Sequence, residues 1–525
     1  MSSAAAVSPL PLFNAADHLV DRHLREGRGG HTAVIASSRT LTYAELADEM
    51  HRVAGGLRRL GVRPEERVMF CMADDAELFT GILAAMYLGA VPVPVSTMLT
   101  GPELAKVLVN SRARILCCSV EFAAAAAAAA ALAPEVTDVV LDGPADLDLA
   151  TGLAVHPWSD LAAADPLPKA YETWEDSPAL WLYTSGTTGT PKAAMHRHAG
   201  IRDIGEFYGR GVLGLRRGDR CLSVAKLFFA YGLGNSCFLP LAAGATGVLE
   251  RARPTPDVIG ARVLEQRPTV FFGVPTFYAA LLASDLDEGT FASVRQGVSA
   301  GEGLPPVLFE RFRDRFGVEV LDGIGSTEAL HIFLSNRPGR VRQGSSGVPV
   351  PGYEVQLRND AGTVLEETGR PGTLHLRGSS LAVGYWCRTE TTRQVFQGEW
   401  LCTGDAYVRN DDGTYSCLGR TGDMLKAGGI WVSPAEVEER LLQHPDVLEA
   451  AVVAAPDESG LDKPVACVVT RTELAADALI DWCRSGLAAF KRPRAVVAMD
   501  ELPKTATGKI RRNVLRDLVS AVLQR

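Results

Sequence analysis

Residues 180–192 read LWLYTSGTTGTPK, a stretch in which an apolar run leads directly into a loop of glycines and hydroxyl residues. The glycines let main-chain N–H groups turn inward, and the threonines and serine add hydroxyl donors around the same point. Such a loop suits the oxygens of a triphosphate. It is no Walker loop, because the pattern G-x-x-x-x-G-K-[ST] occurs nowhere in the chain and Lys192 follows a proline. A solvated linker is the alternative that this stretch alone leaves open.

Short apolar runs alternate with helical patterns on both sides of this loop, as far as about residue 340. This alternation predicts an α/β fold in which crossover helices cover a parallel sheet. One helix is well marked, because Thr42 and Glu45 form a capping box and Gly61 follows the last apolar position. Nine alanines at 123–131 predict a surface helix. Strands are expected at 68–72, 115–118, 180–183, 270–272 and 318–321.

The pattern changes to period-two alternation between Gly347 and about Leu418, with turn signals at 359–362 and 410–413. It predicts an antiparallel β sub-barrel. A helix start follows, with Ser433 as N-cap, Pro434 at the first position and Glu436 completing a box. We therefore expect a large N-terminal domain, residues 1–421, of parallel α/β subdomains plus the sub-barrel. A small mobile α/β domain, residues 422–525, would follow.

Composition limits the class of protein. The 525 residues are enough for several structural units, and 47% apolar with 22% charged residues excludes wholesale disorder. The net charge of −9 argues against nucleic acid as the main partner. The ten cysteines show no C-x-x-C pair, which favours buried free thiols. No basic N-terminal start and no apolar run of about 20 residues occur, so we expect a cytoplasmic protein without a membrane partner.

Four ordered segments give the chain a family resemblance. The loop at 184–192 (TSGTTGTPK), 323–328 (GIGSTE), 403–405 (TGD) with 419–420 (GR), and 503–509 (PKTATGK) together resemble the adenylate-forming superfamily. That superfamily comprises acyl-CoA synthetases, adenylation domains and luciferases. Within it, 226–234 (KLFFAYGLG) and 326–333 (STEALHIF) are most similar to benzoate-CoA ligases. The resemblance covers almost the whole chain.

The resemblance implies a site for ATP and Mg²⁺. Glu328 would hold the Mg²⁺ and Thr327 would touch phosphate, in keeping with the one or two carboxylates that magnesium takes from a protein. Asp405 would accept the ribose hydroxyls, Arg420 would reach the sugar or the phosphates, and Asp322 could accept the adenine amine. The expected ATP-binding residues are Thr184, Ser185, Gly186, Thr187, Thr188, Gly189, Lys192, Ala300, Gly301, Glu302, Asp322, Gly323, Ile324, Thr327, Asp405 and Arg420.

Lys509 is the expected catalytic cation. Adenylation brings a carboxylate against the α-phosphate, and a cation that reaches both stabilises the charge that builds as the bond forms. The resemblance adds Glu328, Thr184 and Lys192 to the catalytic set. It also implies a slot for a flat aryl acid, lined by Phe229, Ala230, Tyr231, Gly325, His331, Ile332 and Lys509.

A thiol must receive the acyl group in the second half-reaction. No pantetheine carrier segment follows residue 525, so free coenzyme A is the expected acceptor. In the family the C-terminal domain rotates between the two steps, which here would bring Lys426, Gly428 and Gly429 towards the thiol. Gly422 stands at the hinge position, where the family commonly has Asp or Lys.

The implied activity is an AMP-forming aryl acid CoA ligase of the benzoate type, with ATP and coenzyme A as co-substrates. The chain could also form a homodimer. A stand-alone enzyme that loads an aryl acid onto a carrier protein, and a fatty acyl-CoA ligase, remain alternatives. A serine hydrolase is a rival of another class, because 297–301 match the G-x-S-x-G elbow around Ser299. Retention of Glu328 and Lys509 argues against a non-catalytic nucleotide-binding subunit. Weaker signals are the G-x-G-x-x-G match at 209–214 and the pair His196 and His198.

Overall fold

Two sheets with parallel strands at their centres form the larger part of the molecule. The computed structural model describes residues 11–143, 153–185, 191–421, 425–427, 430–456, 462–487, 491–504 and 510–523. The first sheet has the order β4 (Val91–Pro94), β3 (Arg67–Cys71), β5 (Ile115–Ser119), β6 (Asp138–Asp142), β7 (Ala154–Pro157). The second runs β16 (Val348–Pro349), β15 (Ile332–Ser335), β14 (Val320–Gly325), β13 (Gln296–Ser299), β12 (Val270–Gly273), β10 (Arg220–Ser223), β11 (Thr246–Val248), β1 (Thr32–Ile35), β2 (Thr40–Thr42).

Antiparallel strands complete the N-terminal part, as the alternation after Gly347 predicts. The curved sheet comprises β17 (Tyr353–Arg358), β18 (Pro371–Gly378), β19 (Phe396–Gln397), β20 (Trp400–Arg409) and β21 (Tyr415–Arg420). A separate hairpin joins β8 (Pro178–Ser185) to β9 (Pro191–Arg197). The helices of this part are α1 (Ala15–Leu19), α2 (Asp21–Arg25), α3 (Tyr43–Arg59), α4 (Ala76–Tyr87), α5 (Gly101–Ser111), α6 (Ala123–Ala130), α7 (Trp158–Ala162), α8 (His198–Ile204), α9 (Ala230–Leu233), α10 (Leu239–Ala243), α11 (Pro256–Gln266), α12 (Pro275–Ala283), α13 (Pro306–Phe316) and α14 (Thr389–Val395).

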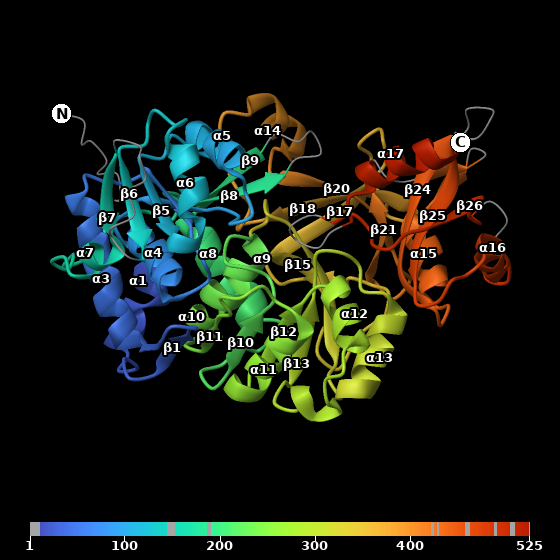
Figure 1. Cartoon of the computed structure of the whole chain (residues 1–525), viewed down its shortest axis with the longest axis horizontal. Helices are drawn as coiled ribbons and strands as arrows, with labels where there is room; N and C mark the ends of the chain where they lie inside the picture. Colours follow the sequence, from blue (N-terminus) through green and yellow to red (C-terminus); the bar gives the residue numbers. More distant parts are fainter. Residues whose placement is uncertain are drawn as a thin grey trace, which may run out of the picture.

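The C-terminal elements gather at one side of this body, beside the curved sheet (Figure 1, red). Apolar residues pack on both faces of their main sheet, one cluster under α15 and α16 and another under α17. The elements are β22 (Leu425–Ala427), β23 (Ile430–Val432), α15 (Pro434–Leu442), β24 (Val447–Pro456), β25 (Asp462–Thr470), α16 (Ala476–Arg484), β26 (Ala495–Ala498) and α17 (Arg512–Leu523). The predicted fold class is therefore confirmed. Among the described residues, no helix is both long and apolar enough to cross a bilayer.

Of the two capping boxes that the sequence predicts, the structure contains the first. The amide of Thr42 donates to Glu45 at 2.8 Å, the amide of Glu45 donates back to the Thr42 hydroxyl at 3.2 Å, and α3 begins there as predicted. The second capping box is wrong. Ser433 precedes α15, but its hydroxyl donates to the carbonyl of Leu418 at 2.6 Å, and Glu436 pairs with Lys491.

The alanine helix is more than a tolerant surface element. Four alanines of α6, at 123, 126, 129 and 130, are buried. A Cβ at Gly101, the first residue of α5, would lie only 2.8 Å from the Cβ of Ala128. Small side chains therefore allow α5 and α6 to pack closely, and the surface helix predicted from the alanine run buries one of its faces.

Candidate functional site

The signature loop lies at the turn of the β8–β9 hairpin. The strand register pairs Thr184 with Lys192 and Ser185 with Pro191 across its base. Because the two strands pair there, the ends of the loop are held at a fixed separation. Residues Gly186, Thr187, Thr188 and Gly189 lie outside the described residues.

Glu328 lies beside this hairpin, on the segment that follows β14. The hydroxyl of Tyr385 donates to Glu328 Oε1 at 2.7 Å, and the Lys192 ammonium lies 5.6 Å from the centroid of the same ring. Burial and the Glu328 carboxylate raise the pKa of Tyr385 well above its usual value, so its hydroxyl stays protonated and remains a donor. Tyr385 therefore links the predicted metal carboxylate to the predicted phosphate lysine.

Main-chain contacts brace the same segment. His196 Nε2 donates to the carbonyl of Thr327 at 2.9 Å, and the amide of Ala382 donates to the carbonyl of Glu328 at 2.8 Å. Burial lowers the pKa values of His196 and His198 to about 4, so both rings are neutral. His198 Nδ1 accepts the amide hydrogen of Ala15. The two histidines thus hold the backbone, and the described residues contain no cluster of three side chains suited to a metal.

Asp405 and Arg420 face each other across β20 and β21, as the register of the two strands requires. Arg420 Nη1 lies 3.2 Å from Asp405 Oδ1 and donates to the carbonyl of Thr403 at 2.8 Å. The Asp405 side chain is 16% exposed and that of Arg420 is 57% exposed. Gly404, immediately before Asp405, has a φ of +72°, a conformation that favours glycine. Because Arg420 is more than half exposed, the pair contributes little to stability, and its guanidinium remains accessible to a ligand.

Asp322 is a buried carboxyl at the start of the 323–328 segment. It pairs with Ser299 where β13 runs parallel to β14, and its Oδ1 has no hydrogen-bond partner within the described chain. Burial raises the pKa of Asp322 to about 8, although main-chain hydrogen bonds from Leu304 and Gly323 lower it. A buried acceptor without a partner fits the expected contact with an amine.

We expect Asp322 to make the stability of the protein depend on pH. The carboxyl of an exposed aspartate has a pKa of 3.8, whereas that of folded Asp322 is about 8. The protonated Asp322 carboxyl contributes fully to stability below the pKa of the unfolded state, and this contribution is lost as the pH rises through the pKa of the folded state. The unfolding midpoint of wild type should therefore fall relative to that of Asp322→Asn from about pH 5 to about pH 9. Thermal unfolding of both proteins checks this, and a difference that stays constant over the range would contradict it.

Three of the predicted aryl residues, Tyr231, Gly325 and Ile332, lie around His331. The ring centroids of Tyr231 and His331 lie 5.9 Å apart, and a Cβ at Gly325 would lie 2.6 Å from the carbonyl oxygen of His331. His331 is 2% exposed, and its Nε2 lies 2.9 Å from Asn235 Oδ1. Burial lowers the pKa of His331 to about 3, so this uncharged ring donates to Asn235. Ile332 is fully buried beside it, while Phe229 and Ala230 lie where α9 begins.

Two positioning residues were missed by the sequence analysis. Tyr385 lies 57 positions from Glu328, and Asn235 lies 96 positions from His331. Neither belongs to a spacing pattern with its partner. Only the family segment at 226–234 ended close to Asn235.

Of the C-terminal candidates, only Lys426 lies among the described residues. Lys426 lies in β22, which pairs with β23 and packs near β25. Gly422, Gly428, Gly429 and Lys509 lie outside the described residues. The described ends of the terminal segment meet, because Lys504 and Ile510 form an antiparallel bridge and the amide of Arg511 donates to the carbonyl of Pro503 at 2.8 Å.

The rival motifs do not form sites. Ser299 is fully buried at the end of β13, its hydroxyl has no partner within the described chain, and α13 begins only at Pro306. A nucleophile elbow needs an exposed hydroxyl at a sharp strand-to-helix turn, so the geometry is not that of a serine hydrolase. The match at 209–214 begins inside the π-helical segment 205–210 and follows no strand.

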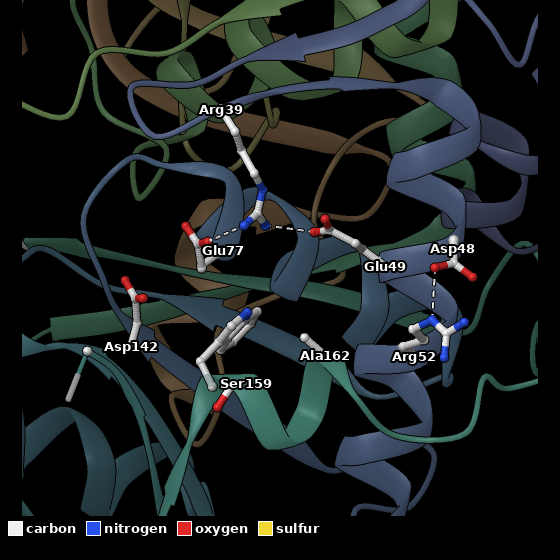
Figure 2. Close-up of a pocket in the computed structure, with 10 residues that line it drawn as sticks. Arg39, Asp48, Glu49, Arg52, Glu77, Asp142, Ser159 and Ala162 are labelled. Carbon is white, nitrogen blue, oxygen red and sulfur yellow. Dashed lines mark hydrogen bonds and ion pairs between the residues drawn. The ribbon is translucent and has the colours of Figure 1, made fainter. Parts of the chain in front are cut away.

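A cavity of about 460 Å³ lies elsewhere, between α3, α4 and α7. Figure 2 shows Arg39 reaching Glu49 and Glu77, at 2.8 and 3.0 Å, and Arg52 paired with Asp48 at 2.8 Å. None of the predicted site residues lines it. The arginines that line it are thus already paired with neighbouring carboxylates, and the cavity has no link to the site around Glu328.

Fold and site together define a nucleotide-dependent, acid-activating enzyme. The model of the AMP-binding enzyme family matches residues 20–386, and that of the AMP-binding enzyme C-terminal domain matches 436–509. The chain therefore belongs to the AMP-binding enzyme family. The predicted resemblance to the adenylate-forming superfamily, and to benzoate-CoA ligases within it, is confirmed.

Known relatives match over almost the whole chain. The benzoate–CoA ligase of Thauera aromatica is 43% identical over 516 residues, which are 96% of each chain. The benzoate CoA ligase structure from Burkholderia xenovorans LB400 has a TM-score of 0.88 and 44% identity, covering 96% of this chain and 100% of that one. The anthranilate CoA ligase AuaEII in complex with anthranoyl-AMP has a TM-score of 0.93 and 39% identity, covering 99% of both.

Proposed function

We propose that this protein is an ATP-dependent, AMP-forming ligase that joins an aryl carboxylic acid of the benzoate type to coenzyme A. The observation that supports the proposal is that one short segment, 325–332, makes contacts with both groups of predicted residues. Gly325, His331 and Ile332 face the aryl group of residues, and Thr327 and Glu328 face the hairpin of Lys192. An acid bound beside His331 and a nucleotide bound beside Glu328 would bring the carboxylate and the α-phosphate together at this segment.

The first step would form the acyl-adenylate and release pyrophosphate. The donor set at Glu328 fits Mg²⁺, a hard cation that takes a carboxylate oxygen and shares its other positions with water and phosphate. When bound, Mg²⁺ would neutralise phosphate charge. Tyr385 would orient the Glu328 carboxylate, and Lys509 would stabilise the charge that develops as the acid attacks the α-phosphate. The phosphates would be held by Thr184, Ser185, Gly186, Thr187, Thr188, Gly189 and Lys192.

The rest of the nucleotide would lie along the ends of β13, β14 and β20. Asp405 and Arg420 would contact the ribose, and Asp322 would accept the adenine amine. Close packing against the base would come from Ala300, Gly301, Glu302, Gly323 and Ile324.

The second step would transfer the acyl group to the thiol of coenzyme A and release AMP. We divide the chain into an adenylation domain, 1–421, and a C-terminal domain, 422–525, that turns about Gly422. The turn would move Lys509 away from the α-phosphate and bring Lys426, Gly428 and Gly429 towards the thiol. This separates the two half-reactions in time. A homodimer and a cytoplasmic location remain predictions.

The substrate class is tested by AMP formation with ATP, coenzyme A and a panel of acids. Benzoate and its amino and hydroxy derivatives should give a kcat/KM at least about tenfold above those of hexanoate, octanoate and decanoate, since a slot built for a flat ring aligns a flexible chain poorly. Equal or better turnover of the fatty acids would favour the fatty acyl-CoA ligase instead. Replacing coenzyme A by a phosphopantetheinylated carrier protein in the same assay separates the carrier-loading alternative.

A further inference from the structure

The segment that carries Lys509 has a structured neck. Residues Pro503 and Lys504 on one side pair with Ile510 and Arg511 on the other. Lys504 Nζ lies 2.7 Å from the Glu449 carboxylate, which fixes one side of the neck to β24. The residue after the neck, Arg512, pairs with Glu438 of α15 and donates to the carbonyl of Val452. The neck therefore moves with the C-terminal elements.

A long-range hydrogen bond ties this neck to the N-terminal part. The amide of Ile510 donates to Glu302 Oε1 at 3.2 Å, across 208 residues of sequence. Glu302 is half-buried on the turn between β13 and α13, three residues beyond Ser299, which pairs with Asp322. A carboxylate that accepts a main-chain N–H makes a stronger hydrogen bond than a neutral acceptor does. The bond also fixes a point of the backbone, which a contact between two mobile side chains would not.

We propose that Glu302 is a positioning residue. During adenylation its carboxylate would hold the neck of the Lys509 segment at the ends of β13 and β14, where the nucleotide is proposed to bind. The proposal rests on the proposed function, because it assigns Glu302 to one of two half-reactions. Docking at Ile510 holds the residue beside Lys509 in place and restricts where the ammonium can reach. A hydrogen bond of this kind can break when the C-terminal domain turns for the thiol step.

This role differs from the adenine contact that the sequence predicts for Glu302. A residue that only bound the base would act through the KM for ATP and would affect both half-reactions, because the adenylate keeps its adenine. A docking residue acts through kcat of the first half-reaction. The two roles therefore give different kinetic patterns.

The test compares Glu302→Ala, Glu302→Gln and the control Glu319→Ala in the full chain. Glu319 Oε2 also accepts a main-chain amide, from Gly339 at 2.9 Å, but within the N-terminal part. Glu302→Ala should lower kcat of benzoate-dependent pyrophosphate exchange about tenfold, with the KM for ATP held within about twofold. Consumption of supplied benzoyl-adenylate by coenzyme A should fall far less. The glutamine variant keeps an acceptor oxygen and should recover part of the loss, and Glu319→Ala should match wild type.

Hydrogen exchange of the peptide spanning 503–511 gives a second readout, independent of activity. Exchange there should be faster in Glu302→Ala than in wild type and in the control. Equal exchange, equal loss in both half-reactions, or a raised KM for ATP at unchanged kcat would each overturn the docking role. Absence of aryl-dependent pyrophosphate exchange in wild type would instead refute the proposed function, while the exchange comparison would still test the contact.

Discussion

Replacing Lys509 with alanine is expected to reduce carboxylate-dependent pyrophosphate exchange by about 10³-fold, while most of the thiolation of a supplied acyl-adenylate survives. The reacting carboxylate and the α-phosphate are both anions, and a cation that reaches both stabilises the transition state more than the separate reactants. Lys504 pairs with Ile510 in the neck, and Ile510 is bonded to Glu302. A cation on the segment between these two residues would therefore lie close to the proposed nucleotide site. Radioactive pyrophosphate exchange and coenzyme A-dependent consumption of benzoyl-adenylate measure the two steps separately.

A matched variant is Lys491→Ala, which removes another ammonium from the C-terminal part. Lys491 pairs with Glu436 of α15, and its side chain is 24% exposed. Loss of such a partly exposed pair should change the exchange rate by no more than about twofold. Undiminished exchange in Lys509→Ala would remove Lys509 from the adenylation chemistry, and an equal loss in the two variants would point to general electrostatic weakening of the C-terminal part.

The contrast between Thr42 and Ser433 shows what sequence could and could not predict. Both precede a helix with a glutamate three positions later, and only Thr42 forms the capping box. The Ser433 hydroxyl instead meets Leu418, on a strand that the sequence places in another domain. A local pattern predicts a helix start well, since the competing partner is usually solvent. It fails where tertiary structure brings a better acceptor to the same hydroxyl.

The residues of the site fall into the same two groups, those that a local pattern predicts and those that only the tertiary structure brings together. The family segments predicted Glu328, Asp405, Arg420 and His331 as site residues, because each of these residues lies inside a segment that carries the resemblance. The residues that orient them come from elsewhere: Tyr385 for Glu328, Asn235 for His331 and His196 for Thr327. These contacts depend on how sheets and hairpin pack together, and hydrogen-bond partners at such separations leave no periodic trace in a single chain.

Replacing Gly234 with alanine is expected to lower kcat/KM for benzoate about 100-fold, the second large effect. A Cβ there would lie 2.2 Å from His331 Cδ2 and 2.7 Å from Nε2, closer than any real contact. The imidazole is buried and bonded to Asn235, so it must shift as a rigid ring, and Tyr231 packs beside it. A displacement of about 1 Å at the wall of a binding site is enough for losses of this size. Steady-state kinetics with benzoate, at saturating ATP and coenzyme A, measure the effect.

The control for this variant is Gly209→Ala, one of the glycines in the rejected dinucleotide match. A Cβ at Gly209 would lie 3.4 Å from Leu239 Cδ2, an ordinary van der Waals contact. Both glycines are buried in π-helical segments, so the two variants share the change in backbone entropy and differ in what the methyl group meets. Gly209→Ala should keep kcat/KM within about threefold of wild type. Gly234→Ala should still unfold cooperatively and bind ATP, because overpacking of this kind costs about 1 to 3 kcal/mol. If both variants lost activity equally, or if Gly234→Ala turned over benzoate normally, His331 would not form the wall of the aryl slot.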